Sequence, residues 1–575
     1  MIAQHYETRE YIYPVNRNTL YLKLYLNSKD NYEVSIIYWK RFHEYQMNSS
    51  LMINRSIDGN SPYFTGIIEA TEPIHYIRYY FKLSNLKETL YYTPWGIETD
   101  QPQKFFEYMY VNSLDLFTEV KSFQGKIGYH LFLDRFYNGN PLNDPSSIVP
   151  WDTIPTRENF FGGDLEGLRQ KLPYLLDLKI DVLFLLPIFK SHSNHKYDTV
   201  DYFEIDEAYG TIDEFKSLVN EIHSHGMKIV LDGVFNHIGY YSSIFQDVIN
   251  KGIKSIYYDW FYIRGEFVDT EKVNYECVGD YKWMPKLNYA SKSLREYIIN
   301  VGKYWIEEAH IDGWRLDVAD EVDYTFWCEF RRELKPLNEN LILVAETWKD
   351  GKDLLRGDQM DSVMNYKLRE LIINFLTHDA LTVKRLNNRI EKLFFEYPMI
   401  THNVLYNHVS SHDTERVITA LHNNQSLLKL AILMQMTLPG LPVIYYGDEV
   451  GIDGENDPLC RKTMNWDLIN NDIHLFTKSL IELRKSTLAL SIGEYKSVFL
   501  DFNIYSFLRI YDNEAYLILI NRYEKDAYIV FHPADYFKDC KVSNDKVEIN
   551  TKVAAFGYKL IKMTYNNSLI TTNIL

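Results

Sequence analysis

The chain of 575 residues is too long for a single small binding module, and its 46% hydrophobic and 24% charged residues are typical of folded proteins and argue against long disorder. A formal net charge of −17 repels phosphate backbones and anionic membrane surfaces, so neither nucleic acid nor a membrane is expected as a partner. Aromatic residues make up 15% of the chain, and flat rings suit sugar faces, ordinary cores and protein interfaces equally.

The first part of the chain, residues 1–122, is rich in alternating apolar and polar segments. Residues 19–26 and 32–39 are two examples, and turns rich in Asn, Ser, Asp and Gly separate such segments. Alternation with a period of two is typical of strands with one buried face. We therefore predict an N-terminal β-sandwich.

From residue 123 the pattern changes to short apolar strands followed by amphipathic helices, such as 211–225 and 292–309. Eight such units predict a multidomain α/β protein whose central part, residues 123–489, is a (β/α)8 TIM barrel. The predicted strands are 127–133, 182–186, 228–231, 313–316, 342–345, 362–365, 404–408 and 443–446.

Two further segments depart from the repeating barrel pattern. Roughly fifty residues separate the third strand from the next helix, which predicts an inserted subdomain at about 238–291. After a helix near 475–485, short strands such as 516–520 and 527–531 predict a C-terminal antiparallel β domain over residues 490–575.

Acidic residues follow four of the predicted barrel strands. The third strand leads into Asp232, the fourth into Arg315 and Asp317, the fifth into Glu346, and the seventh into His412 and Asp413. Strand ends of such a barrel converge on one mouth, where enzymes of this fold carry their active sites. Any one of these carboxylates has an alternative explanation as a helix N-cap. Taken together, they supply the pair of carboxyl groups that glycoside cleavage requires.

These segments carry a resemblance to a known family. The motifs Asp232…Asn236-His237, Gly313-Trp-Arg315-Leu-Asp317, Ala345-Glu346-Thr-Trp348 and Ser411-His412-Asp413-Thr414 are similar to those of the α-amylase family, glycoside hydrolase family 13. Met284-Pro-Lys-Leu-Asn288 resembles the signature of its neopullulanase, cyclomaltodextrinase and maltogenic amylase subfamily. The match extends over residues 125–490, and residues 1–122 more weakly resemble the starch-binding-type N-terminal domain of that subfamily.

The resemblance implies roles for the three acidic residues. Asp317 would be the nucleophile, Glu346 the general acid/base, and Asp413 the residue that holds the sugar ring and stabilises the distorted transition state. Arg315 lies two residues before Asp317 in a strand and shares its face, so we expect it to keep the Asp317 carboxylate ionised. Because the family retains anomeric configuration, the carboxyls of Asp317 and Glu346 should lie ~5–5.5 Å apart.

The resemblance also implies a set of substrate contacts. Tyr197 would form a stacking platform under the sugar at the cleaved bond, and Glu321 would lie on the acceptor side. Trp283 and Trp348 flank the site and either stack on neighbouring sugars or belong to the core. The remaining predicted contacts are His195, Asp232, His237, Arg315, His412, Asp457 and Arg461.

A cluster of oxygen donors around glycines follows the first predicted strand. Hard oxygen ligands suit Ca²⁺, whereas the alternative is an ordinary turn rich in Asx residues. The segment resembles the structural calcium site of the subfamily, although Asn140 stands where Asp is usual there. The expected ligands are Asn138, Asn140, Asn143, Asp144, the Gly162 carbonyl and Asp164. No organic cofactor is expected.

The leading hypothesis is a retaining hydrolase that cleaves α-1,4 bonds in cyclodextrins, pullulan and maltooligosaccharides, with some α-1,6 cleavage or transglycosylation. The alternatives are an oligo-1,6-glucosidase or α-glucosidase of the same family, and a non-catalytic glucan-binding scaffold. By resemblance, a homodimer through the N-terminal domain is expected. The start of the chain shows no secretory signal, and four scattered cysteines without a CxxC pair suggest no disulfide framework, so we expect a cytoplasmic protein.

Overall fold

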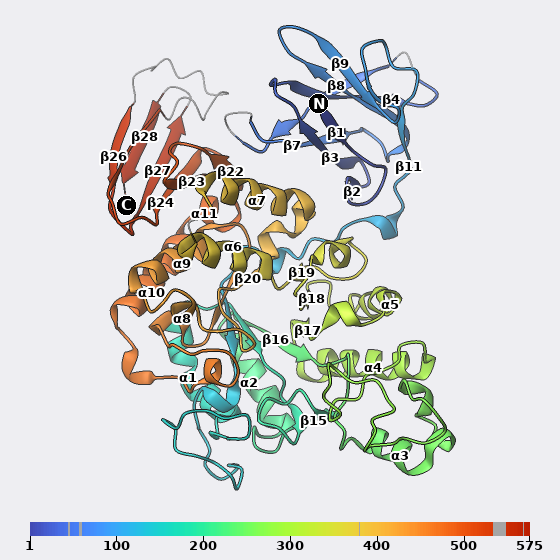
Figure 1. Cartoon of the computed structure of the whole chain (residues 1–575). Coiled ribbons are helices and arrows are strands. Elements are labelled where there is room, and N and C mark those ends of the chain that lie inside the picture. Colours follow the sequence, from blue (N-terminus) through green and yellow to red (C-terminus); the bar gives the residue numbers. More distant parts are fainter. Residues whose placement is uncertain (44–45, 57–59, 379, 533–547, 567–568, 575) are drawn as a thin grey trace.

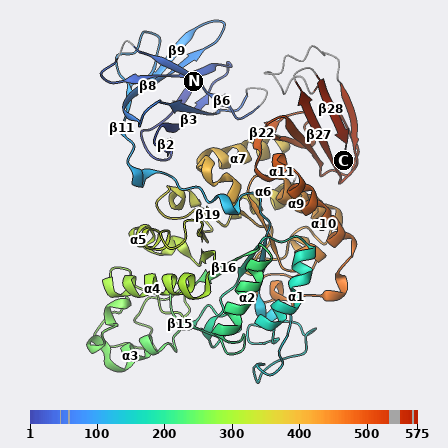
Figure 2. The same ribbon diagram turned by 180° about the vertical axis from the view of Figure 1, so that it is seen from behind.

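The computed structural model describes residues 1–575 except 44–45, 57–59, 379, 533–547, 567–568 and 575. Three parts follow one another along the chain: two antiparallel sheets, a barrel and a further antiparallel sheet. The first and last parts both lie against one side of the barrel, as Figure 1 shows from one side and Figure 2 from behind. The predicted fold class is confirmed.

The N-terminal part pairs its strands into two sheets that enclose a core of apolar side chains. One sheet has the order β1-β3-β7-β6 with β2 paired to β3, and the other has the order β10-β9-β8-β4-β5 with β11 paired to β8. Alternate residues of β4, such as Val34 and Ile36, point into this core, as the period-two pattern predicted. The strands are β1 Ile2–Gln4, β2 Ile12–Asn16, β3 Thr19–Asn27, β4 Glu33–Lys40, β5 Asn48–Leu51, β6 Ile53–Asn54, β7 Tyr63–Glu69, β8 His75–Ser84, β9 Thr89–Thr93, β10 Gly96–Glu98 and β11 Phe106–Tyr110.

Eight parallel strands form the barrel in the order β19-β18-β17-β16-β13-β12-β21-β20. An isolated parallel bridge between Met364 and Tyr406 brings the two outer strands together and nearly closes the sheet. The barrel strands are β12 Gly128–Leu131, β13 Val182–Leu185, β16 Lys228–Gly233, β17 Gly313–Leu316, β18 Ile342–Ala345, β19 Ser362–Val363, β20 Tyr406–Asn407 and β21 Leu441–Tyr445. The sixth and seventh strands are shorter than predicted, because Asn365 caps the next helix and residues 399–404 form a 3₁₀ helix.

Helices surround the barrel, and local sequence explains where several begin. At α2 the Thr211 and Glu214 side chains form a capping box, and at α1 the Asp164 side chain accepts a hydrogen bond from the N–H of Gly167. The helices are α1 Leu165–Asp177, α2 Ile212–Ser224, α3 Ser243–Lys251, α4 Lys292–Ala309, α5 Tyr324–Leu334, α6 Tyr366–Thr377, α7 Val383–Glu396, α8 Val417–Ala420, α9 Gln425–Thr437, α10 Asp472–Ser486 and α11 Leu488–Ile492.

The predicted insertion lies between β16 and α4. It contains α3, two short 3₁₀ turns and isolated bridges such as Ile263 with Tyr275. A separate hairpin, β14 Phe189–Ser191 with β15 Thr199–Ile205, follows β13. Both segments therefore lie after barrel strands, where the loops that surround an active site are found.

The C-terminal part is an antiparallel sheet of order β22-β23-β24-β27-β28 together with the two-stranded sheet β25-β26. The predicted boundary at 489/490 falls inside α11, and the first strand of the sheet starts at Glu494. The strands are β22 Glu494–Val498, β23 Ile504–Tyr511, β24 Glu514–Asn521, β25 Ala527–Phe531, β26 Ile549–Val553, β27 Tyr558–Asn566 and β28 Leu569–Ile574.

Helix α7 connects all three parts. The buried Lys23 of β3 reaches its C-terminal end and donates hydrogen bonds to the carbonyl oxygens of Glu396 and Tyr397, at 3.1 and 3.2 Å. The buried Glu391 accepts hydrogen bonds from the hydroxyls of Ser61, at 2.6 Å, and of Ser497. One carboxylate of the barrel is thus bonded by both flanking domains.

None of the helices in the described part of the chain combines the length and apolar character that crossing a membrane requires. Cys277, Cys328 and Cys460 are free thiols, and Cys540 lies outside the described residues.

Candidate active site

The structure brings the three predicted catalytic carboxyls to one end of the barrel. Asp317 follows β17, Glu346 follows β18 and Asp413 follows β20, and all three face a cavity of about 590 Å³. Asp317 and Glu346 are buried. Predicted residues that line this cavity are His195, Tyr197, His237, Trp283, Asp317, Glu346, Trp348, Asp413, Asp457 and Arg461.

Arg315, on β17, lies below the cavity and contacts three carboxyl groups. Its Nη1 lies 2.8 Å from Asp232 Oδ2 and 3.0 Å from Asp317 Oδ1, and its Nη2 lies 2.8 Å from Glu346 Oε2. Asp232 and Arg315 are adjacent in the register of the parallel strands β16 and β17, which explains their contact. The guanidinium therefore fixes the carboxyl groups of Asp317 and Glu346 relative to each other.

The single positive charge of Arg315 does not compensate the three buried carboxyl groups that it contacts. Burial, followed by the charge of Glu346, raises the pKa of Asp317 well above its ordinary value, and Arg315 only partly offsets these effects. Burial also raises the pKa of Asp232 to about 6, although Arg315 opposes it. The contact with Arg315 therefore does not by itself lower the pKa of Asp317, because burial and the charge of Glu346 outweigh it.

The backbone directly after Asp317 is strained. Val318 adopts the left-handed conformation, with φ of 45°, which a β-branched residue rarely adopts. In this conformation its N–H donates a hydrogen bond to Glu346 Oε2 at 3.0 Å. The strain, on the order of 1–3 kcal/mol, thus coincides with a contact that orients the Glu346 carboxyl group.

Asp413 is held in a chain of charges on the other side of the cavity. Its oxygens lie 2.9 Å from His412 Nε2 and 3.2 Å from Arg461 Nη2, and Arg461 Nη1 lies 3.0 Å from Asp457 Oδ1. Burial alone would raise the pKa of Asp413, but the contacts with His412 and Arg461 outweigh it and hold that pKa below its ordinary value. Asp413 is therefore the carboxylate that stays ionised.

Tyr197, which was predicted to stack under the sugar, lines the cavity. Its hydroxyl contacts His412 Nε2 at 2.6 Å and donates to Asp232 Oδ2 at 3.1 Å, and its ring stacks on that of His412 at a centroid distance of 5.4 Å. Burial lowers the pKa of His195 and of His237 to about 4, so both line the cavity as neutral imidazoles. These groups suit hydrogen bonds to sugar hydroxyls.

The two tryptophans lie at the mouth and not in the core. Trp283 is 45% exposed and stacks on Tyr241, while Trp348 is 57% exposed and stacks on Tyr366 at a centroid distance of 4.2 Å. Glu321 lies next to the site, where its carboxylate accepts from Lys286 Nζ at 3.2 Å, but it does not line the cavity.

Seven residues that line the cavity were not among the predicted site residues, and two of them, Arg157 and Tyr281, have large polar side chains. Arg157 lines the cavity and its Nε donates to Asp457 Oδ2 at 3.0 Å. Tyr281, from the insertion, lines the opposite wall beside Met284. The Met284–Asn288 motif could have drawn attention to Tyr281, whereas the loop that carries Arg157 has no recognisable pattern.

The predicted calcium ligands lie together before α1. Asn138 Nδ2 donates to Asp144 Oδ1 at 2.8 Å. A Cβ atom at position 162 would lie only 2.5 Å from each of these two atoms, so the cluster has room for glycine but not for a larger residue there. Asp164, in contrast, accepts from the N–H groups of Gly139, Asn140 and Gly167 and acts as the helix cap. Within the described residues no group of three or more His, Cys, Asp or Glu is placed to hold a metal ion.

Two family models, several known proteins and solved structures are similar to this chain. The family model described as alpha amylase, catalytic domain, matches residues 130–485, and the model described as alpha amylase, N-terminal ig-like domain, matches residues 1–112. A cyclomaltodextrinase of Thermoanaerobacter pseudethanolicus is 37% identical over 538 residues, which cover 92% of this chain and 93% of that protein. Neopullulanase 2 of Thermoactinomyces vulgaris is 38% identical over 91% of each chain. A solved structure of a cyclomaltodextrinase matches with a TM-score of 0.89 at 32% identity and covers 97% of this chain and 99% of that one.

Proposed function

The chain belongs to the α-amylase family and is a glycoside hydrolase of the cyclomaltodextrinase, neopullulanase and maltogenic amylase type, and on that premise we propose a specific reaction for it. It cleaves α-1,4-glucosidic bonds of cyclodextrins, pullulan and maltooligosaccharides with retention of configuration, with some α-1,6 cleavage or transglycosylation. The observation that carries this proposal is the contact of a single guanidinium with both Asp317 and Glu346 at the mouth of the barrel.

In the proposed mechanism Glu346 donates its proton to the glycosidic oxygen while Asp317 attacks the anomeric carbon. The leaving sugar departs and an ester links Asp317 to the remaining glycosyl group. Glu346, now ionised, takes a proton from a water molecule that attacks the same carbon, which releases the sugar and restores Asp317. A sugar hydroxyl in place of that water gives transglycosylation.

The proposed attack requires an ionised Asp317 and a protonated Glu346. Burial and the charge of Glu346 raise the pKa of Asp317, which disfavours its ionised form in the empty site. A glycosidic oxygen that accepts a hydrogen bond from Glu346 would draw the proton to that residue. Asp413, kept ionised by His412 and Arg461, would stabilise the positive charge of the transition state throughout.

The proposed substrate range follows from relatives and from the mouth of the site. The similar proteins are named cyclomaltodextrinase and neopullulanase. Exposed rings of Trp283, Trp348 and Tyr281 border the cavity, and flat aromatic faces of this kind suit several consecutive sugar units.

A product profile on cyclodextrin, pullulan and maltotriose tests the proposal, with Glu346→Gln as the matched variant. The amide keeps the shape of the side chain but has no proton to transfer, so we expect kcat to fall by at least ~10²–10⁴-fold on all three substrates. Undiminished activity of the variant would refute the acid/base assignment. Absence of hydrolysis by the wild-type protein would refute the proposed function.

Two alternatives are less well supported. An oligo-1,6-glucosidase or α-glucosidase of the same family would not be expected to carry the N-terminal domain and the Met284–Asn288 motif. A non-catalytic glucan-binding scaffold would be expected to lack an acidic group, whereas Asp317, Glu346 and Asp413 all face one cavity. Release of glucose only from α-1,6-linked oligosaccharides would favour the first alternative.

We also propose that the cluster before α1 holds a structural Ca²⁺. The buried Asn138 Oδ1 has no hydrogen-bond partner in the described structure, and it lies beside Asp144 in a cradle that only glycine at position 162 allows. Oxygen atoms of these residues, with those of Asn140, Asn143 and Asp164, would hold the ion, which would stabilise the loop and take no part in the reaction.

Two further proposals concern the protein in the cell. We propose a homodimer formed through the N-terminal domain, which exposes large apolar side chains such as Phe42 and Trp95. A monomeric mass in solution at micromolar concentration would refute it.

We also propose a cytoplasmic location, which the free thiols of the described cysteines support and cell fractionation would test.

A further inference from the structure

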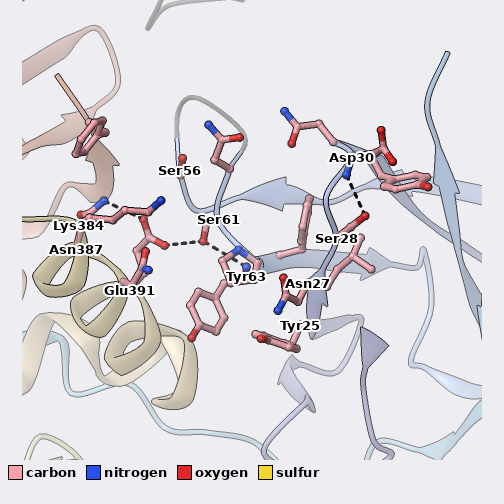
Figure 3. A pocket seen from close by; sticks show the side chains of 18 of the residues that line it. Tyr25, Asn27, Ser28, Asp30, Ser56, Ser61, Tyr63, Lys384, Asn387 and Glu391 are labelled. Carbon is pink, nitrogen blue, oxygen red and sulfur yellow. Dashed lines mark hydrogen bonds between the residues drawn. The ribbon is translucent and has the colours of Figure 1, made fainter. Parts of the chain in front are cut away.

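A second large cavity lies at the junction of the three domains, away from the catalytic mouth. Its volume is about 720 Å³, within the ~300–1,000 Å³ typical of ligand pockets. Its walls come from the N-terminal domain, from α7 and from the loop between β22 and β23 (Figure 3). It shares no lining residue with the catalytic cavity.

Glu391, one of the residues that line this junction cavity, already has hydrogen-bond partners. Glu391, which is 2% exposed, accepts from the hydroxyl of Ser61 (Figure 3). It also accepts from the hydroxyl of Ser497 and, at 3.4 Å, from Asn387 Nδ2. Because both oxygens of this carboxylate already accept hydrogen bonds, it is not a free anionic group awaiting a cation. Its role is to hold the walls in place.

Aromatic rings stand on two walls of the cavity. Tyr25 and Tyr63 of the N-terminal domain lie with ring centroids 5.6 Å apart. Phe499 and Phe502 of the C-terminal domain lie 5.1 Å apart, and Phe502 is 73% exposed. These two ring pairs therefore offer apolar faces to a ligand in the cavity.

Uncharged polar side chains also line the cavity. The cavity carries five amide side chains, contributed by Asn27, Asn31, Asn60, Asn387 and Asn388. Each amide offers both donors and an acceptor, the combination that pairs with hydroxyl groups. Among the described lining residues only Asp30, Lys384 and Glu391 are charged, and Asp30 already pairs with Lys87 at 2.9 Å. This balance disfavours phosphates, nucleotides and acidic peptides as ligands.

We propose that the junction cavity binds an α-glucan chain at a second, non-catalytic site. Sugar rings combine flat C–H faces with a rim of hydroxyls, which is the chemistry that aromatic rings alternating with amides recognise. The choice of an α-glucan rests on the proposed function, whereas the choice of a neutral sugar rests on the cavity alone. A chain bound there contacts all three domains and holds them together.

Calorimetric titration of the full-length Glu346→Gln protein with maltohexaose tests this proposal, because the variant should consume the sugar at least ~10²-fold more slowly than the wild type. We expect two binding events per chain. Phe502→Ala combined with Asn388→Ala in the same background should remove or weaken one event at least tenfold and leave the other unchanged. Tyr528→Ala removes a 75% exposed ring of the C-terminal domain that lies outside the cavity, so it is the matched control and should retain both events.

Three results would overturn the inference: one binding event in Glu346→Gln, two undiminished events in the cavity variant, or an equal loss in the Tyr528→Ala control. In the wild-type background the cavity substitutions should leave kcat/KM on maltotriose unchanged. If the wild-type protein hydrolyses no α-glucan but the cavity-dependent event remains, the proposed function fails and this site stands. If hydrolysis is normal but that event is absent, the site fails and the proposed function stands.

Discussion

Replacement of Arg315 by methionine tests how the active site holds its buried carboxyls. The side chain keeps much of its apolar length, but the guanidinium that contacts Asp232, Asp317 and Glu346 is lost. Removing one partner of a buried ion pair typically costs ~3–5 kcal/mol, because the remaining charge stays buried without compensation. For a barrel of about 360 residues, with an unfolding entropy of ~2.1 cal/mol/K per residue, this corresponds to a loss of roughly 4–7 °C in Tm.

The penalty should depend on pH in a defined direction. The pKa of Asp232 is about 6 with Arg315 in place, and it rises further without that cation. A carboxyl whose pKa is higher in the folded than in the unfolded state loses its contribution to stability as pH rises through the folded value. The Tm difference between Arg315→Met and the wild type should therefore be small near pH 5 and largest near pH 8.

Thermal unfolding followed by calorimetry at about pH 5, 6.5 and 8 measures this difference. Arg264→Met is the matched control, since Arg264 pairs with Glu276 on the exposed surface of the insertion and such pairs contribute ~0–1 kcal/mol. A Tm loss that is the same at every pH, or no larger than that of the control, would refute the view that Arg315 compensates buried charge.

Three further predictions concern other sites. Tyr197→Phe keeps the aromatic ring but removes the hydroxyl that contacts His412 Nε2 at 2.6 Å. We expect kcat/KM to fall by roughly ten- to a hundredfold, which corresponds to ~1–3 kcal/mol. Unaltered kinetics would contradict a role for this contact. Burial lowers the pKa of Lys23 to about 7, so folding above that pH releases a proton from this side chain. The free energy of unfolding of the wild type should therefore rise by up to ~1.4 kcal/mol per pH unit between about pH 7 and 9. Lys23→Met should lack this gain, and equal pH slopes of Tm in the two proteins would exclude it. Chelation with EDTA should lower the Tm of the wild type but not that of Asp144→Asn, and added Ca²⁺ should restore it; a wild-type Tm indifferent to EDTA would remove the calcium site.

Much of the fold could be predicted because it depends on patterns that are local in sequence. The segments predicted at 19–26 and 32–39 are strands β3 and β4, and the helix predicted at 292–309 matches α4. The acidic residues were found because each follows a short apolar strand, and the parallel barrel then brings Asp317, Glu346 and Asp413 to one mouth. Local periodicity and strand order were sufficient for these features.

The features that could not be predicted depend on contacts between distant segments. The protonation of Asp317 is set by Glu346 and by burial, which the neighbouring Arg315 does not reveal. Arg157 reaches Asp457 across a loop that carries no sequence signal. The junction cavity combines residues of β3, α7 and the loop after β22, so no single segment indicates it.

The links through α7 also constrain the order in which the chain folds. Lys23 finds its partners 373 and 374 residues later in the chain, and Ser61 meets Glu391 after 330 residues. Ser497, the second hydroxyl on Glu391, follows that residue by a further 106 positions. Contacts of such long range form slowly, and during synthesis on the ribosome the N-terminal sheets emerge well before the helix that receives them. The N-terminal domain therefore completes its docking only when most of the barrel has been made, and recombination that exchanges this domain alone would have to bring a matching α7 with it.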